Sequence, residues 1–502
     1  MGVYDFTVYS IIERNACIHA ERIGWVSENE RITHLQFAKT VNRVANGLLE
    51  TGIVKGDRIG VLAQNSMAYF YLYGAAARIG AIMLPINFRL SPEEIEYIII
   101  DGAPKILFVD FEYLDTITSI ASKLSSVQRF FTMAEETEKY TSFFSLLEYD
   151  EIEVPCEVGS EDSFVIIHTA AVSGKPRGAV LSHRGLVSAN LQSMYIWQLT
   201  HEDCHLCMLP LFHVAALGTS LNVIHAGGKN VIIPRFDPDR ALQHIQDDQV
   251  TIFIEFPPML ETLFEHNKKL RCVLNSLRIV GGLDHPETVK KFEELTGGTF
   301  WTAYGQSEVS GLVTYAPYFE KAGSAGLPGY MAEVKIVDEY GNFLDFGKNG
   351  EIVVRGPMVF NGYWNLEKDT AYTFREGWHH TGDQGHFDPD GYLWFSGRMP
   401  EKELIKPGGE NVYPAEVEKA ILEHPHVKEV CVIGVPDAQW GEAIKAVCVL
   451  EQGVTLGETE LIDFVASKIA RFKKPKYLEF VKQLPKNNEG LIDREKVKAT
   501  FG

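Results

Sequence analysis

Glycine and basic residues are concentrated in residues 168–180, which read HTAAVSGKPRGAV. An apolar run at residues 164–167 precedes them and predicts a buried strand. Small residues let backbone N–H groups approach an anion, and Lys175 and Arg177 add positive charge. The Walker pattern G-x-x-x-x-G-K-[ST] is absent, so the segment is either a phosphate-binding loop of another kind or a plain surface turn.

Three further motifs carry side chains that could hold a nucleotide. In Y-G-Q-S-E, Ser307 and Glu308 follow a strand-like run, and ligands bind at the C-terminal ends of strands in open α/β sheets. A carboxylate beside a phosphate loop suits Mg²⁺, which takes few protein ligands and several phosphate oxygens. In T-G-D, Asp383 is expected to follow a tight turn and to accept hydrogen bonds from ribose hydroxyls. The motif K-P-G-G-E-N-V-Y-P predicts a glycine turn before a helix that starts at Pro414.

Composition restricts the class of protein. A chain of 502 residues is long enough for about three domains at ~150 residues each, and 45% hydrophobic residues can build large cores. The formal net charge of −20 argues against non-specific binding to nucleic acid or to an anionic membrane. A polyanionic ligand must therefore meet a local cluster of cations.

The sequence predicts no targeting or membrane segment. The N-terminal residues lack a basic region followed by an apolar one. Residues 70–84 are apolar, but they are interrupted by Arg78 and too short to span a bilayer. Seven scattered cysteines fit a reducing cytoplasm better than a disulfide scaffold. Cys204 and Cys207 form a C-x-x-C pair without a second ligand pair, so we expect ordinary strand cysteines.

Strand and helix patterns alternate along the first two thirds of the chain. Residues 33–52 predict an amphipathic helix that ends at Gly52. Ser91, Pro92 and Glu94 predict a capped helix start. Short apolar runs predict strands at residues 59–62, 106–109, 231–233, 251–256 and 277–280. Such units predict an α/β fold with parallel sheets flanked by helices.

The pattern changes twice towards the C-terminus. After about residue 323, short strands at residues 334–337 and 352–354 alternate with turns at residues 341–342 and 390–391, which predicts a small barrel-like subdomain. The charged turn at residues 399–403 indicates a hinge. We therefore expect a large N-terminal domain at residues 1–398 and a small mobile α+β domain at residues 399–502.

Together these motifs resemble the adenylate-forming superfamily of acyl-CoA synthetases, luciferases and peptide-synthetase adenylation domains. The similarity runs from about residue 30 to 495 with the motifs in the family's order, and includes P-L-F-H, which ends at His213, and the pair Gly281 and Gly282. The resemblance implies an AMP-binding acyl-CoA synthetase similar to a fatty-acid–CoA ligase.

The resemblance implies a reaction in two steps. A carboxylate attacks the α-phosphorus of ATP to give acyl-AMP and pyrophosphate, and the thiol of CoA then takes the acyl group. The partners are a small carboxylic acid, ATP with Mg²⁺, and CoA. Between the steps the C-terminal domain is expected to rotate about the hinge. The sequence does not indicate the oligomeric state, and a homodimer stays open.

Residue roles follow by position from the same resemblance. Ser307 would contact the α-phosphate, Glu308 would bind Mg²⁺, and Asp383 and Arg398 would hold the ribose. His213 would gate the acyl pocket. The remaining implied cofactor contacts are Thr169, Ser173, Gly174, Lys175 and Arg177 for phosphate, Gly282, Leu283, Tyr304, Gly305 and Gln306 around the nucleotide, and Gly408 and Gly409 for pantetheine.

The phosphate loop departs from the family pattern T-S-G-T-T-G-x-P-K-G. Ala170 and Val172 replace two hydroxyl residues, and Ala171 replaces a glycine. A hydrogen bond to a charged group contributes about 1.5–3 kcal/mol, so the losses should weaken phosphate binding. Ala171 would also be strained if this position needs a positive φ.

A second departure lies near the C-terminus, where the family reads P-x-x-x-x-G-K-I-x-R. That lysine bridges the carboxylate and the α-phosphate during adenylation, and here Leu491 stands in its place. Leucine offers no charge to the reacting phosphate, and Lys486 is the nearest candidate substitute. We therefore expect an enzyme that is slow in adenylation or that works in the ATP-forming direction.

Two alternatives remain. The departures would also fit a catalytically reduced protein that binds acyl-CoA or nucleotide. A peptide-synthetase-like module is less favoured, because residues 212–222 carry no acid to pair with an amino group and no carrier domain follows.

The acyl group is expected to be apolar. Glu255 is the exception near the expected pocket, and it either recognises a polar tail or faces solvent; we favour solvent. The candidate walls are Leu211, Val214, Leu217, Gly281, Leu283, Val309 and Gly311.

Overall fold

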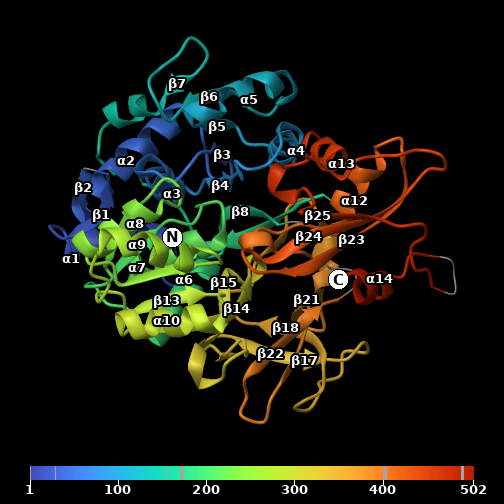
Figure 1. Ribbon diagram of the computed structural model, residues 1–502. Coiled ribbons are helices and arrows are strands. Elements are labelled where there is room, and N and C mark those ends of the chain that lie inside the picture. The colour runs from blue at the N-terminus through green and yellow to red at the C-terminus, as the bar shows by residue number, and fades with distance from the viewer. Residues whose placement is uncertain (1, 29, 154, 170–174, 400–403, 488–490) are drawn as a thin grey trace.

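A computed structural model describes residues 2–28, 30–153, 155–169, 175–399, 404–487 and 491–502 (Figure 1). The described strands form four sheets, two of them large and mainly parallel. Among these residues no helix is both long and apolar enough to cross a membrane. The fold is mixed α/β, as the alternating strand and helix patterns predicted.

The larger sheet has nine strands in the order β16-β15-β14-β13-β12-β10-β11-β1-β2. Its central strands are parallel, and antiparallel pairing is confined to its two ends. Its strands are β1 (Ile23–Ser27), β2 (Glu30–Thr33), β10 (Cys204–Cys207), β11 (Lys229–Ile232), β12 (Ile252–Glu255), β13 (Ile279–Gly282), β14 (Thr299–Gln306), β15 (Gly311–Pro317) and β16 (Leu327–Pro328). Cys204 and Cys207 are buried free thiols of a strand, as predicted.

The second sheet has eight strands in the order β19-β9-β8-β4-β3-β5-β6-β7. The strands from β8 to β7 in this order are parallel, whereas β8, β9 and β19 pair antiparallel. They are β3 (Arg58–Leu62), β4 (Ile82–Pro85), β5 (Ile106–Val109), β6 (Arg129–Thr132), β7 (Thr141–Ser142), β8 (Ser163–Thr169), β9 (Arg177–Ser182) and β19 (Gly362–Tyr363).

Helices cover both faces of each large sheet. One continuous core joins the two sheets through α1 (Val8–Ile18), α2 (His34–Glu50), α3 (Met67–Ile79), α6 (His183–Trp197) and α7 (Val214–His225). The outer face of the nine-stranded sheet packs against α8 (Pro238–Asp247), α9 (Met259–Leu270) and α10 (Pro286–Thr296). The outer face of the eight-stranded sheet packs against α4 (Pro92–Gly102) and α5 (Leu114–Ile120).

Local signals place the helix ends. Thr33 caps α2 through the Gln36 backbone N–H, and α2 ends at Glu50, two residues before Gly52 with φ +88°. The Ser91 hydroxyl and the Glu94 carboxylate form the predicted capping box at the start of α4. These start signals were therefore readable from the sequence.

A smaller antiparallel sheet follows and is curled. It contains β17 (Glu333–Val337), β18 (Gly350–Arg355), β20 (Phe374–Arg375), β21 (Trp378–Phe387) and β22 (Leu393–Arg398), with α11 (Glu367–Thr373) beside it. One prediction is corrected here: Asp383 does not follow a tight turn but lies inside β21, because Gly382 bends the strand at φ +66° without ending it.

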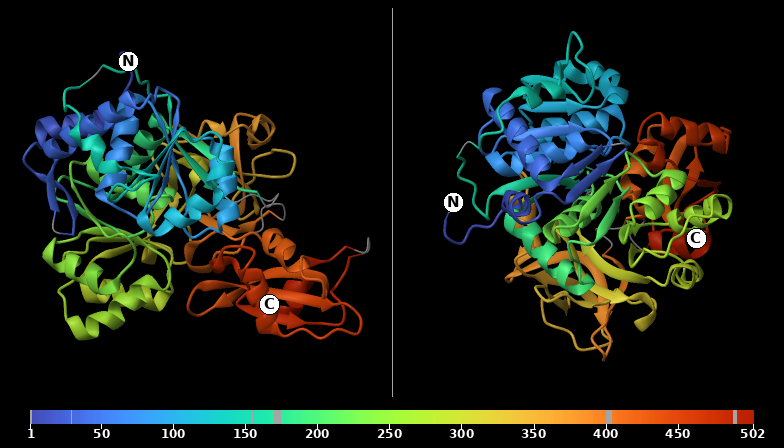
Figure 2. Two further views of the ribbon diagram at one scale, coloured as in Figure 1. Left: turned by 90° about the horizontal axis from the view of Figure 1, so that it is seen from above. Right: turned by 90° about the vertical axis from the view of Figure 1, so that its left-hand side faces the viewer.

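The C-terminal domain is small and has its own sheet, and Figure 2 shows it (orange to red) on one side of the molecule. Its strands are β23 (Val427–Asp437), β24 (Gly441–Leu450) and β25 (Tyr477–Phe480), and its helices are α12 (Pro414–Leu422), α13 (Glu458–Ala466) and α14 (Arg494–Phe501). α12 begins at the predicted Pro414. Most of the predicted hinge, residues 400–403, lies outside the described residues, and the boundary at residue 398 stays a prediction.

Candidate active site

One group of side chains gathers where β8, β14 and β19 end. Glu308 lies just after β14 in a short helix, η4 (Ser307–Val309), and is 6% exposed. Its Oε1 accepts hydrogen bonds from the Tyr363 hydroxyl at 2.9 Å and the Thr169 hydroxyl at 3.4 Å. The Arg177 guanidinium stacks 4.1 Å from the centre of the Tyr363 ring and pairs with Asp369 at 2.9 Å. The structure thus brings Thr169, Arg177 and Glu308 together, whereas their roles stay a prediction.

Charge and burial fix the protonation states of this group. Burial opposes the charge of Arg177, but Tyr363, Asp369 and Glu308 outweigh it and raise the pKa of Arg177. Burial and the neighbouring Glu308 raise the pKa of Tyr363 far above its ordinary value. Tyr363 therefore remains a neutral phenol that donates to Glu308, and Arg177 remains a cation.

The described part of the phosphate loop begins again at Lys175. Its ammonium lies 5.6 Å from the centre of the Tyr97 ring, and the Tyr97 hydroxyl donates to the Pro176 carbonyl at 3.2 Å. This cation is therefore held on the side of α4. The predictions made for Ala170, Ala171, Val172, Ser173 and Gly174 fall outside the described residues.

A second group surrounds Asp383, which lies directly opposite Arg398 in the register of β21 and β22. Arg398 Nε donates to Asp383 Oδ1 at 3.1 Å. The Tyr304 hydroxyl and Gln306 Nε2 donate to Asp383 Oδ2 at 2.8 and 3.3 Å. Burial and the nearby Asp383 raise the pKa of Tyr304 well above its ordinary value, so its hydroxyl keeps its proton. The arrangement presents a carboxylate, an amide and a guanidinium to a neighbouring hydroxyl-rich ligand.

The strand ends beside these groups approach each other closely. Gly282 has φ +151°, and a Cβ there would lie 2.1 Å from the Glu255 carbonyl oxygen. A Cβ on Gly305 would lie 1.9 Å from the Gly311 carbonyl oxygen. Both positions therefore need glycine. Leu283, which follows β13, is 64% exposed.

The expectation for Glu255 was wrong. The residue is fully buried, and neither carboxylate oxygen has a hydrogen-bond partner in the described structure. Burial, reinforced by Asp284, raises its pKa well above the ordinary value. Because side chains alternate along a strand, Glu255 shares the face of Phe253, which packs against the layer of α8–α10. The layered position of β12 thus buries this side chain despite its polarity.

The glycine turn of the C-terminal domain packs against the N-terminal domain. Gly408 and Gly409, in η7 (Pro407–Gly409), have φ of +57° and +85°. A Cβ on Gly408 would lie 2.8 Å from the Trp440 ring, and one on Gly409 would lie 3.0 Å from the Phe256 ring. Only glycine fits both the backbone and the space, so the loop approaches the end of β12 through bare backbone.

Glu410 extends this contact to the predicted gate. Its carboxylate pairs with the Arg89 guanidinium and accepts hydrogen bonds from His213 Nε2 and Asn87 Nδ2, both at 3.5 Å. Burial disfavours the carboxylate, but His213 and Arg89 outweigh it and lower the pKa of Glu410 to about 2. Glu410 is therefore ionised at neutral pH.

Tyr413 places the same loop near both site groups. Burial is the main cause that raises its pKa to about 12, and the charges of Arg398, Glu308, Arg177 and Asp383 also act on it. A phenol from the C-terminal domain therefore lies within electrostatic reach of both the Glu308 and the Asp383 groups.

The structure does not place Lys486 in either group. Its ammonium pairs with Glu429 at 2.6 Å within the C-terminal domain. Leu491 is 62% exposed, and its backbone N–H donates to the Asn487 side chain at 3.0 Å. In this pose position 491 is thus turned to solvent, while Gly408 and Gly409 meet the N-terminal domain.

Sequence reasoning gave no role to Tyr363, Trp440, Arg89 or Asn87. Glu410 was noticed only as part of its motif. No local pattern marks these residues, because their partners lie far away in the chain; 321 positions separate Arg89 from Glu410. The one local hint for Arg89 is its place shortly after the end of β4, at the edge where ligands bind.

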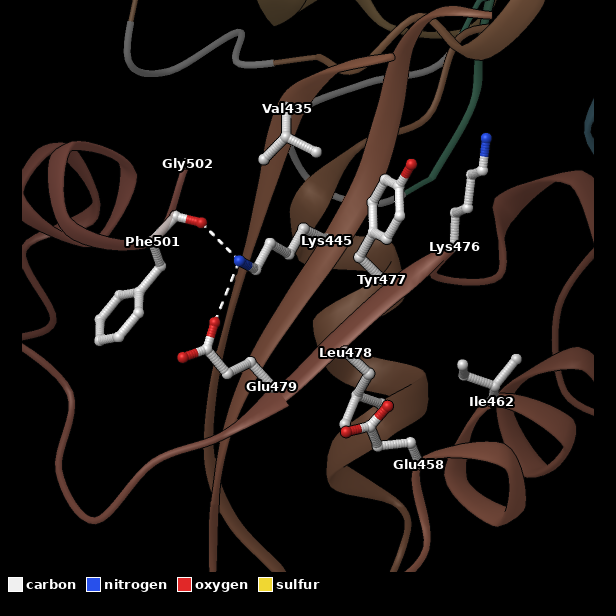
Figure 3. Close-up of a pocket in the computed structure, with 10 residues that line it drawn as sticks. All are labelled: Val435, Lys445, Glu458, Ile462, Lys476, Tyr477, Leu478, Glu479, Phe501 and Gly502. Atoms are coloured by element: carbon white, nitrogen blue, oxygen red, sulfur yellow. Dashed lines mark hydrogen bonds and ion pairs between the residues drawn. The ribbon is translucent and has the colours of Figure 1, made fainter. Parts of the chain in front are cut away.

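A pocket of about 380 Å³ lies elsewhere, in the C-terminal domain between β24, β25, α13 and the chain end (Figure 3). Lys445 points into it, but its ammonium already pairs with Glu479 at 3.0 Å and donates to the Phe501 carbonyl at 2.6 Å. It contains none of the predicted site residues, so we do not regard it as the candidate site.

Known families match both parts of the chain. Residues 12–364 match the AMP-binding enzyme family, and residues 416–491 match the AMP-binding enzyme C-terminal domain. The indoleacetate–CoA ligase of Aromatoleum aromaticum is 32% identical over 97% of this chain and 96% of its own length. A feruloyl-CoA synthase of an Amycolatopsis species is 33% identical over 94% of both chains.

Two solved structures differ in how well they superpose on the whole chain. The o-succinylbenzoate CoA synthetase of Bacillus subtilis, bound with its product analogue, is 27% identical and has a TM-score of 0.87 over 98% of both chains. ATP-bound MatB of Rhodopseudomonas palustris is 29% identical and has a TM-score of 0.72 over 99% of both chains. The arrangement described above is therefore closer to that of the structure with the product analogue.

Proposed function

This chain belongs to the AMP-binding enzyme family of AMP-forming acyl- and aryl-CoA ligases, and we propose that it joins an apolar carboxylic acid to CoA through an acyl-AMP. The observation that carries the proposal is the pair of polar groups around Glu308 and Asp383. One group suits phosphates and the other suits a ribose, and between them they fit one nucleotide.

The Glu308 group suits a magnesium nucleotide. Both described hydrogen bonds reach Oε1, and a carboxylate has several further lone pairs for a hard cation. Bound Mg²⁺ would neutralise charge on the phosphates. In our proposal Ser307 contacts the α-phosphate from the start of η4, and Arg177, fixed by Tyr363 and Asp369, adds a positive charge beside it.

The Asp383 group suits the rest of the nucleotide. Asp383 would accept the ribose hydroxyls while Arg398 holds the carboxylate in place. Tyr304, Gln306 and Gly305 at the end of β14, with Gly282 and Leu283 after β13, would border the base. Bare backbone at Gly282 and Gly305 would let a flat ring approach the strand ends closely.

The observed pose suits the thioester step. The thiolate of CoA would attack the acyl carbonyl carbon, form the C–S bond and release AMP as the C–O bond breaks. Gly408 and Gly409 have no side chains, so the pantetheine of CoA could approach the bare backbone of this loop, which Trp440 and Phe256 flank. The better superposition on the product-analogue complex supports this assignment.

The hydrogen bond between Glu410 and His213 would link the position of His213, the proposed gate, to the docking of the C-terminal domain. His213 occupies the N-terminal cap position of α7 and contacts Glu410 of the docked loop. We propose that the docked loop holds His213 beside the acyl pocket, whose walls include Leu211 and Leu217 at the core of the N-terminal domain.

The first test follows AMP release in the presence of ATP, Mg²⁺ and CoA with a panel of acids. We expect AMP with apolar aryl and alkyl acids and none with small polar acids, because most wall residues are apolar. AMP formed from amino acids would favour the peptide-synthetase-like reading. Tight binding of acyl-CoA or nucleotide without any turnover would favour the catalytically reduced binding protein.

A cross-link should separate the two steps. Glu93 and Lys474 are exposed neighbours of residues in contact across the two domains, and Cys17 is an exposed native thiol. In a Cys17→Ser background, Glu93→Cys and Lys474→Cys joined by a bismaleimide would trap the observed pose. We expect thioester formation from synthetic acyl-AMP to survive and acyl-AMP formation from acid and ATP to stop.

The control is the same double-cysteine protein without the reagent, which should carry out both steps. If the cross-linked protein also carries out both steps at unchanged rates, rotation of the C-terminal domain is not part of the cycle.

A further inference from the structure

Three charged side chains from the two domains meet around Lys473. This lysine ends η8 (Arg471–Lys473) and is only 4% exposed. Its ammonium donates to Glu416 of α12 at 2.6 Å and also pairs with Glu94 of α4. Figure 1 shows α4, which belongs to the N-terminal domain, beside α12 and α13 of the C-terminal domain. One buried cation therefore joins the domains.

Glu94 is held in place by its own helix before the domains meet. Its Oε2 accepts the Ser91 backbone N–H at 2.7 Å, which completes the capping box, while Oε1 meets Lys473. A side chain that is already ordered loses little rotamer freedom on docking. The N-terminus of α4 thus presents a fixed carboxylate to the C-terminal domain.

We propose that Glu94 is a positioning residue that holds the C-terminal domain in the pose where Gly408 and Gly409 meet the N-terminal domain, and that Glu416 makes this hold depend on pH. Lys473 and Glu416 belong to the same domain and move together. Rotation would therefore separate only Glu94 from them. The link to thioester formation rests on the function proposed above, whereas the link to the pose does not.

The balance of charges sets the direction of the pH effect. In this pose two carboxylates share one ammonium, and the charges that act on Glu416 are Lys473 and Glu94. Burial, opposed by Lys473 and reinforced by Glu94, raises the pKa of Glu416 to about 7. Burial also opposes the charge of Glu94, but Lys473 outweighs it and lowers the pKa of Glu94.

The sign follows from linkage. The pKa of Glu416 is higher in this pose than in a separated domain, where a glutamate ordinarily titrates near pH ~4.3. Its contribution to the pose is therefore present at low pH and is lost as pH rises through about 7. The contribution of Glu94 is lost in the opposite direction, as pH falls through its lowered pKa. The docked pose should therefore be most populated at a pH slightly below 7.

The test begins with Glu94→Gln, which removes the charge but keeps the cap, because glutamine at this position of a capping box accepts the same N–H. At about pH 6, thioester formation from synthetic acyl-AMP and CoA should fall about tenfold or more, since one partner of a buried ion pair is lost. Acyl-AMP formation from acid and ATP should not fall. The exposed neighbour Glu93, changed by Glu93→Gln, is the matched control and should behave as wild type in both reactions.

A second measurement does not depend on catalysis. Spin labels at the exposed positions 148 and 458, attached through non-canonical amino acids, report the distance between the domains. In the wild type the population of this pose should fall between about pH 6 and 8. Glu416→Gln imitates the protonated acid and should keep the pose across this range, whereas Glu94→Gln should deplete it throughout.

These results separate the inference from the proposed function. The expected distance changes in a protein without ligase activity would support the positioning role and refute the function. Unchanged distances in Glu94→Gln, or an equal fall in both half-reactions, would refute the positioning role.

Discussion

Replacing Glu308 with glutamine should lower the rate of acyl-CoA formation by about 10²-fold or more while the protein stays folded. The carboxylate lies beside Arg177 and Tyr363, at the place proposed above for the phosphates, where a bound Mg²⁺ would balance the charge of the nucleotide. Glutamine keeps the shape of the side chain and can still accept the Tyr363 hydrogen bond. A lower rate of acyl-CoA formation would therefore result from the lost negative charge. Initial rates with saturating ATP, Mg²⁺ and CoA measure it.

Tyr363→Phe is the matched control. It removes the 2.9 Å hydrogen bond to the same carboxylate but leaves the charge in place. A hydrogen bond to a charged group contributes about 1.5 kcal/mol or more, so we expect a fall of about tenfold, smaller than that in Glu308→Gln. Thermal unfolding of both variants should stay close to that of the wild type. Wild-type turnover in Glu308→Gln would remove this residue from the catalytic assignment.

Because position 491 is leucine, the wild type should carry out adenylation and thioester formation at very different rates. A bridging lysine supplies charge in adenylation only, and Leu491 supplies none. We expect acyl-AMP and CoA to give acyl-CoA much faster than acid and ATP give acyl-AMP. Leu491→Lys should raise the adenylation rate and leave thioester formation nearly unchanged, because position 491 is exposed in the pose assigned to the second step.

Pre-steady-state rates of each half-reaction provide the measurement. The gain should increase further when Ala170→Ser and Val172→Thr restore the phosphate-loop hydroxyls. Lys486→Gln tests the alternative cation, which pairs with Glu429 in the observed pose. Rapid adenylation by the wild type, lost in Lys486→Gln and unchanged in Leu491→Lys, would show that Lys486 has taken over the role.

Features set by local chemistry were predictable from the sequence. The capped start of α4, the strand before Thr169 and the placing of Glu308 after β14 each depend on residues a few positions apart. The family resemblance implied that Asp383 and Arg398 both hold the ribose, and the structure brings the two together across neighbouring strands.

Features set by distant contacts were not predictable. The ion pairs of Arg89 with Glu410 and of Glu94 with Lys473 join segments more than three hundred positions apart, so neither leaves a periodic or local trace. The burial of Glu255 was misjudged for a related reason. Its polarity indicated solvent, but the helices that cover the outer face of β12 bury it.

Three of the polar side chains that contact the docked C-terminal domain, Asn87, Arg89 and Glu94, lie in one short stretch of the N-terminal domain. The proposed acyl walls come from other elements, chiefly α7 and the ends of β13–β15. Mutations in these walls can therefore alter the choice of acid without touching that stretch, whereas a change at His213, which contacts Glu410, would affect both. Such a division would favour divergence by gene duplication, because a copy could acquire a new acid while the docking stretch stays unchanged. The indoleacetate–CoA ligase and the feruloyl-CoA synthase, which share about a third of their residues with this chain over nearly its whole length, are named for different acids.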